Sequence, residues 1–425
     1  MSDVDALAYV MAGGAGTRLF PLTRDRAKPG VPFAGNYRVI DFPLSNVLNS
    51  NIRKTIILTQ YESFSTKNHI SHGFLRRVGF GRDQYLEIQP AMKGTDKGWY
   101  EGTADSINQN IRFMKEDMPD VVDILGGDHV YLMDYRLKNN FHLNNNADLT
   151  ISAIPVKKEL AANNYGVLVV DKNWQLKGWE EKPSNPTSMP GNEEYCLASM
   201  GNYAFNPESL LEELANDKLK EQTDDKKKME KHPDKYTMHD FGFNIIPSML
   251  NSGKKIFVYN FNDNMVPGAK ESERGYWKDI GNIDQYFAAN MEMRYAEPPI
   301  NLYNPKWDIF THIESFEPFK TINTKYHTAK TENSIISNGV INSGGQIQNS
   351  IVSYNVKIEK GAFIENSIIL GHGTIGQDSH IKNSIIDRKN NIPDKELIGV
   401  DPVKDKERGF TVSEGGVTVV PRNYF

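Results

Sequence analysis

The feature that most constrains the fold of this 425-residue chain is a repeat near its C-terminal end. Tetrapeptides of the form Asn-Ser-Ile-Ile or Asn-Ser-Ile-Val begin at residues 333, 349, 366 and 383, at spacings of 16, 17 and 17 residues. Short β-branched runs separated by Asn, Gly and Ser cannot bury an apolar face alone, whereas coils stacked on one another can. A period of about three hexapeptides per coil therefore predicts a β-helix. We expect this region to cap the rest of the protein or to form an oligomer interface, rather than to carry a second active site.

Residues 6 to about 295 follow a different pattern, in which apolar β-type runs alternate with amphipathic helical runs. This alternation is typical of an α/β domain with a mostly parallel sheet. The expected strands are 6–12, 55–59, 121–125, 149–156, 167–170 and 256–261. The expected helices are 103–116, which Thr103 should cap, then 135–144 and 207–215. The densely charged stretch 216–236 is expected to be a solvated loop or helix end.

These patterns predict two domains and a connection. The first domain covers 1–295 and the β-helix covers 325–425, because one hydrophobic core rarely serves a chain of this length. The stretch 296–324, with AEPP and NPKW, loses periodicity and is expected to be a surface linker.

The composition excludes several classes of protein. A net charge of -5 and a pI near 6.1 give no global basic field, so we expect neither a nucleic-acid partner nor an anionic membrane. The first residues carry acids rather than a basic leader, so no signal peptide is expected. A single cysteine, Cys196, allows no intrachain disulfide, fits a reducing cytoplasm, and is expected to be a small buried hydrophobe.

The first candidate site is a glycine-rich turn directly after the first expected strand. Its sequence, GGAGTRLFPLTRDRAKPG, places Arg18 and Lys28 behind Gly13, Gly14 and Gly16. Backbone N–H groups can approach phosphate oxygens closely there, because these glycines carry no side chain. It is neither a Walker A loop nor GxGxxG. Because cations follow the turn, the pattern favours the phosphates of a nucleotide.

Two acids form the second candidate site. Asp128, in LGGDHVY, follows an expected strand, and Asp279, in YWKDIG, precedes a helix expected to begin near Asn282. Acids at the carboxyl ends of parallel strands lie where open α/β sheets bind ligands. Mg²⁺ prefers a few carboxylates together with phosphate oxygens. We therefore predict that Asp128 and Asp279 share one Mg²⁺.

Small polar clusters at strand ends suggest a sugar-nucleotide cleft. In WEEKP, Lys182 offers a point charge for a sugar phosphate and Glu181 offers an acceptor for sugar hydroxyls. Similar clusters occur in ASMGNY (199–203), HDFG (Asp240) and GTADS (102–106).

Taken together, these motifs resemble one family closely. AGGAGTRL, RAKPG, RVIDFPLSN, ILTQY, WYEGTADSINQN, LGGDHVY, WEEKP, ASMGNYAF, HDFG and YWKDIG are similar to the ADP-glucose pyrophosphorylases along nearly the whole chain. The resemblance implies a Rossmann-like nucleotidyltransferase domain with a mostly parallel mixed sheet, followed by a left-handed parallel β-helix of hexapeptide repeats. It also implies a cytoplasmic homotetramer that converts ATP and glucose 1-phosphate into ADP-glucose for glycogen synthesis.

The resemblance also assigns residues. It implies that Arg18, Lys28, Asp128 and Lys182 serve catalysis and that Asp128 and Asp279 hold Mg²⁺. The implied nucleotide-binding residues are Gly13, Gly14, Ala15, Gly16, Thr17, Gln60, Gly102 and Thr103. The implied residues for glucose 1-phosphate are Tyr100, Gly166, Glu181, Lys182 and Ser199, with Asp240 and Trp277 nearby.

Regulation is where the chain departs from the family. Sugar-phosphate or nucleotide effectors are expected to meet Arg26, Arg38, Arg388 and Arg422. Asp25, Pro32 and Glu116 stand where enteric relatives have basic residues, and Ala15 replaces a frequent arginine. Fewer cations predict weak binding of multiply phosphorylated sugars such as fructose 1,6-bisphosphate.

Three alternatives stay open from sequence alone. The enzyme could use UTP, dTTP or GTP instead of ATP, since the base pocket is not readable. A regulatory subunit without catalysis would have lost site cations or acids, yet all are present. Acyl transfer by the β-helix would rest on His372 and His380, to which no role is assigned.

Overall fold

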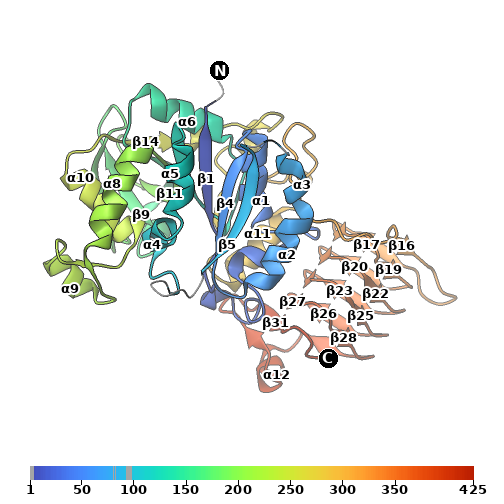
Figure 1. Ribbon diagram of the computed structural model, residues 1–425. Coiled ribbons are helices and arrows are strands. Elements are labelled where there is room, and N and C mark those ends of the chain that lie inside the picture. The colour runs from blue at the N-terminus through green and yellow to red at the C-terminus, as the bar shows by residue number, and fades with distance from the viewer. Residues whose placement is uncertain (1–3, 80, 82, 92–97) are drawn as a thin grey trace.

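The computed structural model describes residues 4–79, 81, 83–91 and 98–425, and its first domain is built on a nine-stranded mixed sheet (Figure 1). The main path of the sheet runs β10-β9-β11-β6-β1-β4-β5, and β14 joins β11 through β8. Among the described strands of this sheet, only β10 and β11 run against the others. The strands are β1 (Ala6–Met11), β4 (Lys54–Thr59), β5 (Tyr85–Pro90), β6 (Val121–Gly126), β8 (Leu149–Lys157), β9 (Gly166–Val170), β10 (Leu176–Glu181), β11 (Tyr195–Phe205) and β14 (Ile256–Asn260).

Helices cover both faces of this sheet, and the central strand β1 shows why its sequence is a continuous apolar run. Leu7 and Tyr9 enter the core on one face, and Ala8 and Val10 enter the core on the other. A strand buried on both faces cannot alternate apolar with polar residues. One face carries α4 (Thr103–Asn108), α5 (Ile111–Asp117), α8 (Pro207–Lys218) and α10 (Ile246–Asn251), and the other carries α1 (Asp41–Asn49), α2 (Ser63–Gly73), α3 (Leu75–Val78) and α6 (Tyr135–Asn144).

The six expected strands and the helices 135–144 and 207–215 are present with small changes at their ends. The prediction of one helix over 103–116 is wrong, because the helix is interrupted at Asn110. The Asn110 carbonyl accepts a hydrogen bond from the Tyr9 hydroxyl at 3.0 Å, and its side-chain amide donates to the Ser106 carbonyl at 2.9 Å. Thr103 is the first helical residue rather than the cap, and Gly102 takes the cap position. The Thr103 hydroxyl is hydrogen-bonded to Asp240 and to the Phe241 N–H instead.

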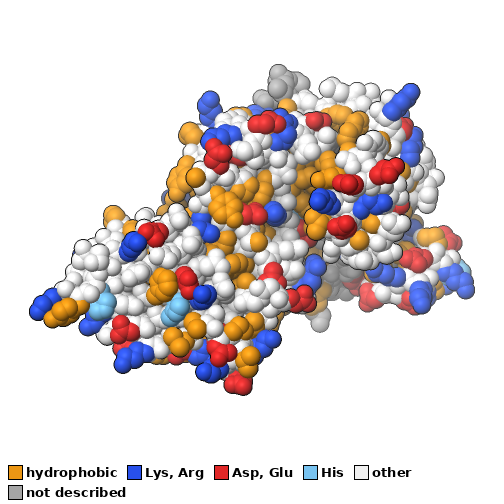
Figure 2. Space-filling view, turned by 180° about the vertical axis from the view of Figure 1, so that it is seen from behind, with side chains coloured by type: hydrophobic (Ala, Val, Ile, Leu, Met, Phe, Trp, Pro, Cys, Tyr) orange, Lys and Arg blue, Asp and Glu red, His pale blue; other side chains and the backbone are white. Residues whose placement is uncertain are grey.

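The charged stretch 216–236 is mostly exposed, as expected, but it also contains ordered elements. Helix α9 (Lys226–Lys231) begins after Asp225, whose carboxylate accepts from two backbone N–H groups. Strands β12 (Glu221–Gln222) and β13 (Tyr236–Thr237) pair in parallel on either side of it. Lys and Arg are interspersed with Asp and Glu over the described residues of the face in Figure 2, without a field of one sign. Among the described helices, none is both long and apolar enough to cross a membrane.

The C-terminal domain is a parallel β-helix made of three sheets. Two five-stranded sheets run β16-β19-β22-β25-β28 and β17-β20-β23-β26-β29, and the third runs β18-β21-β24-β27-β31-β30. The strands are β16 (Lys320–Thr321), β17 (Lys330–Glu332), β18 (Ile335–Ile336), β19 (Ile341–Asn342), β20 (Gln346–Gln348), β21 (Ile351–Val352), β22 (Val356–Ile358), β23 (Phe363–Glu365), β24 (Ile368–Ile369), β25 (Gly373–Ile375), β26 (His380–Lys382), β27 (Ser384–Ile386), β28 (Asn391–Ile392), β29 (Leu397–Ile398), β30 (Thr411–Val412) and β31 (Thr418–Val420), with helix α12 (Pro402–Glu407) inserted before β30.

Each residue of the Asn-Ser-Ile repeat has its own structural task. The asparagines turn the chain with φ values of 45°, 46°, 43° and 42° at Asn333, Asn349, Asn366 and Asn383, a conformation that Asn tolerates better than most residues. The serine hydroxyls form a ladder, because the backbone N–H of Ser350 donates to Ser334 Oγ at 3.0 Å and that of Ser367 donates to Ser350 Oγ at 3.1 Å. The repeat therefore fixes the register between coils.

The two apolar residues that end each repeat serve different cores. Val352, Ile369 and Ile386 point into the β-helix interior. Ile351, Ile368 and Ile385 point the other way and pack in a core shared with the first domain. Successive residues of a strand face opposite sides, so a β-helix docked along one sheet needs both positions to be apolar.

Polar contacts reinforce this interface. Arg26 of the first domain binds the Asp387 carboxylate of the β-helix at 2.9 and 3.0 Å, and both side chains are buried. The connection after α11 (Ile283–Glu292) contains neither helix nor strand from residue 293 to 319, and Trp307 anchors it. The Trp307 indole is buried and donates to Asn46 Oδ1 at 3.1 Å. The two domains are thus joined by a continuous packed surface.

Candidate active site

A two-lobed cleft lies at the carboxyl ends of β1 and β6. The larger lobe, of about 400 Å³, is lined by the glycine turn, Gln60, Tyr100 and Gly102. The smaller lobe, of about 320 Å³, is lined by Gly166, Glu181, Lys182, Ser199 and Trp277. Both lobes share Met11, Thr103, His129, Gly201 and Asp240. Two ligands bound in the lobes would therefore meet at the shared wall.

The glycine turn is shaped by what packs against it. Gly16 has a φ of 62°, and a Cβ there would lie 2.8 Å from Lys28 Cβ. A Cβ on Gly13 would lie 3.1 Å from Gln60 Cβ. Ala15 and Thr17 are exposed, whereas Gly13 and Gly14 line the larger lobe. Glycine at these positions lets the turn approach Lys28 and Gln60 closely.

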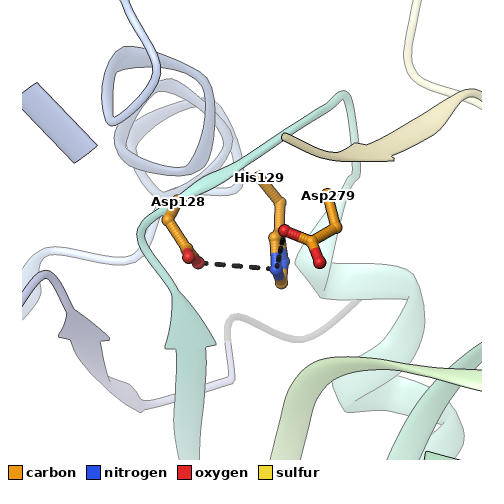
Figure 3. Close-up of side chains that lie close together, drawn as sticks. All are labelled: Asp128, His129 and Asp279. Carbon is orange, nitrogen blue, oxygen red and sulfur yellow. Dashed lines mark ion pairs between the residues drawn. The ribbon is translucent and has the colours of Figure 1, made fainter. Parts of the chain in front are cut away.

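The two predicted metal-binding acids lie together beside His129 of the shared wall (Figure 3). Asp128 lines the larger lobe and Asp279 lines the smaller one. Strands β7 (His129–Tyr131) and β15 (Trp277–Asp279) pair antiparallel, with Asp279 opposite His129. This pairing brings Asp279 beside Asp128, which precedes β7. Ligand atoms of Asp128, His129 and Asp279 all lie within 4.8 Å of one another. Two carboxylates and an imidazole at this separation fit one divalent cation, and the carboxylate oxygens suit Mg²⁺.

Lys28 lies between the same two acids. Its ammonium nitrogen is 2.9 Å from Asp128 Oδ2 and 2.7 Å from Asp279 Oδ1. Burial alone would raise the pKa of Asp128, but the charges of His129 and Lys28 outweigh it and lower that pKa to about 2. Burial opposes the charge of Lys28, yet the two carboxylates raise its pKa. Asp128 is thus held ionised beside the Lys28 ammonium group.

His129 is a site residue that the sequence did not reveal. Its Nε2 lies 3.4 Å from Asp128 Oδ1 and 3.9 Å from Asp279 Oδ1, and its ring packs against Trp277 with centroids 5.1 Å apart. The available signal was its position directly after Asp128. A histidine next to a predicted metal-binding acid is itself a candidate ligand.

Arg18 approaches the same wall from the outside. It is exposed, and a Cβ on Gly281, two residues after Asp279, would lie 3.6 Å from Arg18 Nη2. Arg18 makes no ion pair with any described residue. Its charge is therefore available to an anion in the cleft.

The predicted sugar-side residues cluster in the smaller lobe, with one difference. Glu181 is half-buried, and burial raises its pKa. A Cβ on Gly166 would lie 2.6 Å from the Trp179 ring, so glycine is required for this packing. Tyr100 lies in the larger lobe instead. Its backbone N–H donates to Gln60 Oε1 at 2.9 Å and its hydroxyl donates to the Gln89 carbonyl at 3.2 Å.

Thr103 and Asp240 brace each other where the lobes meet. The Thr103 hydroxyl donates to Asp240 Oδ2 at 2.9 Å and accepts from the Phe241 N–H at 3.0 Å. Asp240 Oδ1 accepts from the N–H groups of Gly242 and Phe243. A Cβ on Gly102 would lie 2.2 Å from the His239 carbonyl oxygen. The Thr103 hydroxyl and both carboxylate oxygens of Asp240 are therefore engaged within the protein.

The predicted effector residues lie between the domains, and two of them form ion pairs with acidic side chains of the protein. Arg26 is buried on Asp387, and Arg388 Nη2 lies 2.7 Å from Glu314 Oε1. Arg38 and Arg388 line a cavity of only about 20 Å³. Arg422 lies at the same boundary, where its carbonyl accepts from Arg24 Nη2 at 2.8 Å.

Comparison with known proteins agrees with this architecture. Residues 7–295 match the family model for nucleotidyl transferases, and residues 317–420 match the model described as GlmU-like C-terminal hexapeptide. The sheet, the cleft and this match define an enzyme of the nucleotidyltransferase class. Its catalytic domain is followed by a left-handed β-helix of hexapeptide repeats.

Curated relatives narrow the class. A glucose-1-phosphate adenylyltransferase from Geobacter metallireducens is 42% identical over 417 residues, which are 98% of this chain and 97% of the relative. The enzyme of the same name from Trichlorobacter lovleyi is 42% identical over 419 residues, with 98% and 97% covered. That from Bifidobacterium longum is 39% identical over 422 residues, with the same shares covered. The chain belongs to the glucose-1-phosphate adenylyltransferase family.

Proposed function

We propose that this protein transfers the adenylyl group of ATP to glucose 1-phosphate, giving ADP-glucose and pyrophosphate. The observation that carries the proposal is the meeting of Lys28, Asp128 and Asp279 where the two lobes join. A reaction between two bound phosphates needs its charge-stabilising groups at that junction.

The reaction follows from the positions of these groups. A phosphate oxygen of glucose 1-phosphate attacks the α-phosphorus of ATP, and the bond to the β-phosphate oxygen breaks as pyrophosphate leaves. Arg18 and Lys28 offset the negative charge that builds up on the phosphates. Asp128 and Asp279 would hold Mg²⁺, with His129 beside them. When bound, Mg²⁺ supplies a Lewis acid that neutralises phosphate oxygens.

The two lobes divide the recognition of the substrates. In the smaller lobe, Glu181 accepts hydrogen bonds from sugar hydroxyls and Lys182, which is half-exposed, reaches the sugar phosphate. In the larger lobe, the glycine turn offers backbone N–H groups to the triphosphate, and Gln60 and the Gly102 segment flank the nucleotide. No protein nucleophile is required, because the attacking atom belongs to the substrate.

The family likeness supports wider proposals. We propose that the protein serves glycogen synthesis in the cytoplasm as a homotetramer and responds to sugar-phosphate or nucleotide effectors at the domain boundary. Arg26 is already paired with Asp387, and Arg388 is already paired with Glu314. Multiply phosphorylated sugars are therefore expected to bind there weakly.

The test is nucleotide choice by the purified protein. Pyrophosphate release is measured with glucose 1-phosphate, Mg²⁺ and each of ATP, UTP, dTTP and GTP, and ADP-glucose is identified by mass spectrometry. We expect kcat/KM for ATP to exceed the others by at least about tenfold, a difference of about 1.4 kcal/mol. A preference for UTP, or inactivity with every nucleotide, would reject the proposal.

A further inference from the structure

The position of the Lys28 ammonium group sets a condition on metal binding. Its nitrogen contacts one oxygen of Asp128 and one of Asp279, at 2.9 and 2.7 Å. A Mg²⁺ shared by the acids would need oxygens of the same two carboxylates. The ammonium group and the ion therefore compete for the same pair of side chains, and a dication beside a retained ammonium group would be strongly repelled.

The backbone of Lys28 is anchored by the glycine turn, and its charged end is held by the two acids alone among the ion pairs of the described residues. The Lys28 N–H donates to the Gly14 carbonyl at 3.4 Å, and its Cβ packs against Gly16. Four methylene groups separate this anchored backbone from the ammonium nitrogen. The next residue, Pro29, lines the larger lobe together with Gly14 and Asp128. A change of side-chain rotamer can thus carry the charge from the acids into the lobe without moving the backbone.

We propose that Lys28 blocks the metal site of the free protein and leaves it when a triphosphate enters the larger lobe. The proposal rests on the function proposed above, because the triphosphate provides the new partner for the ammonium group. Lys28 then has two successive positions, first on the carboxylates and afterwards on the phosphates. The free protein binds divalent cations weakly, and cation and nucleotide bind cooperatively.

This arrangement gives the charged groups a partner at each stage. In the free protein, the Lys28 ammonium group contacts both carboxylates and offsets one of their two charges. In the loaded site, both carboxylates face the cation while Lys28 faces phosphate oxygens. At neither stage is a buried charge left without a partner, which would be costly.

The experiment measures Mn²⁺ binding to the full chain without substrates, by electron paramagnetic resonance of the free ion. Mn²⁺ accepts the same oxygen and imidazole ligands. We expect Lys28→Met to bind Mn²⁺ at least tenfold more tightly than the wild type. Lys28→Arg, which keeps the charge, should stay within threefold of the wild type. Adding Asp279→Asn to Lys28→Met should abolish the gain, which places the ion at this site.

Lys278→Met is the matched control, because it removes the same charge one residue from Asp279. Lys278 Nζ lies 3.4 Å from Glu292 and contacts neither site acid. It should change the Mn²⁺ affinity by less than threefold. If Lys28→Met does not fold, as judged by circular dichroism, Lys28→Gln carries the same expectation with a neutral donor retained.

Unchanged or weaker Mn²⁺ binding after loss of the Lys28 charge would overturn the inference, as would an equal gain in Lys278→Met. These results are separable from a failure of the proposed function. A wild type that makes ADP-glucose while Lys28→Met shows no gain refutes only the inference. A wild type inactive with every nucleotide refutes the function whatever the metal affinities are.

Discussion

The two domains differ in how far apart in the sequence their key contacts lie. In the β-helix, each coil is aligned on the next by the same short contacts, such as the serine ladder, and partners are 16 or 17 residues apart. In the nucleotidyltransferase domain, the central ion pair joins Lys28 and Asp279, which are 251 residues apart. The register of the β-helix does not depend on any single residue, because every coil repeats the same contacts. A site assembled from residues far apart in the sequence depends on each of those residues.

This comparison predicts that single changes divide into losses of activity and losses of stability. The largest effect is expected for Asp128→Asn, which should lower kcat by roughly a hundredfold to a thousandfold, as removal of one preorganised charged group does. Lys28 retains Asp279 as a partner, so the free energy of unfolding should change by less than about 2 kcal/mol. Steady-state kinetics and urea unfolding measure the two quantities.

Asp171→Asn is the control for this substitution. Asp171 lies in a turn outside both lobes and accepts from the N–H groups of Asn173 and Gln175, which an amide oxygen can still do. Near-normal turnover in Asp128→Asn would remove Asp128 from the catalytic machinery and weaken the contrast between the domains.

The next effect tests the β-helix. Ile381 is completely buried in its interior, and Ile381→Ala should destabilise the protein by about 3 kcal/mol through lost burial and the cavity left behind. The kcat of the folded protein should be almost unchanged. Ile341→Ala, the same change on an exposed side chain of β19, should cost less than about 1 kcal/mol. Thermal melting followed by circular dichroism compares them, and equal losses would contradict the packing described.

The smallest effect concerns the boundary between the two domains. Hydrogen bonding to His372 first, and then to Arg388, lowers the pKa of Glu314 to about 2, against burial that raises it. A lowered folded-state pKa stabilises the protein above the unfolded-state pKa of about 4.3, and this contribution disappears as the pH falls towards 2. Glu314→Gln should therefore cost about 1–2 kcal/mol at pH 7 and nothing near pH 2.

Urea midpoints of the wild type and Glu314→Gln between pH 2 and pH 7 measure this dependence. Glu317→Gln, an exposed neighbour in the same connection, should show no such trend. A stability difference for Glu314→Gln that is independent of pH would mean that its carboxylate is not held by these cations.

Sequence predicted the β-helix and the acid pair better than the details around them. The repeat was readable because every coil repeats the same contacts, and Asp128 was readable because it closely follows a buried strand. The break at Asn110 was not readable, since it depends on the Tyr9 hydroxyl from another element. Strand β11 was missed because polar Ser199 and Asn202 interrupt it, where its register with β8 shifts. The position of His129 opposite Asp279 depends on the pairing of β7 with β15, and the placement of Tyr100 depends on Gln60. Local sequence encodes neither of these contacts.

The outward isoleucines of the repeat have a consequence for how this protein can be altered. Ile351, Ile368 and Ile385 form a stripe that packs in a core shared with the first domain. A β-helix produced alone would present that stripe to water as an apolar sheet surface prone to self-association. Exchanging either half with that of a relative would therefore succeed only if the facing residues were transplanted too. The residues on the two sides of the domain interface therefore have to match each other.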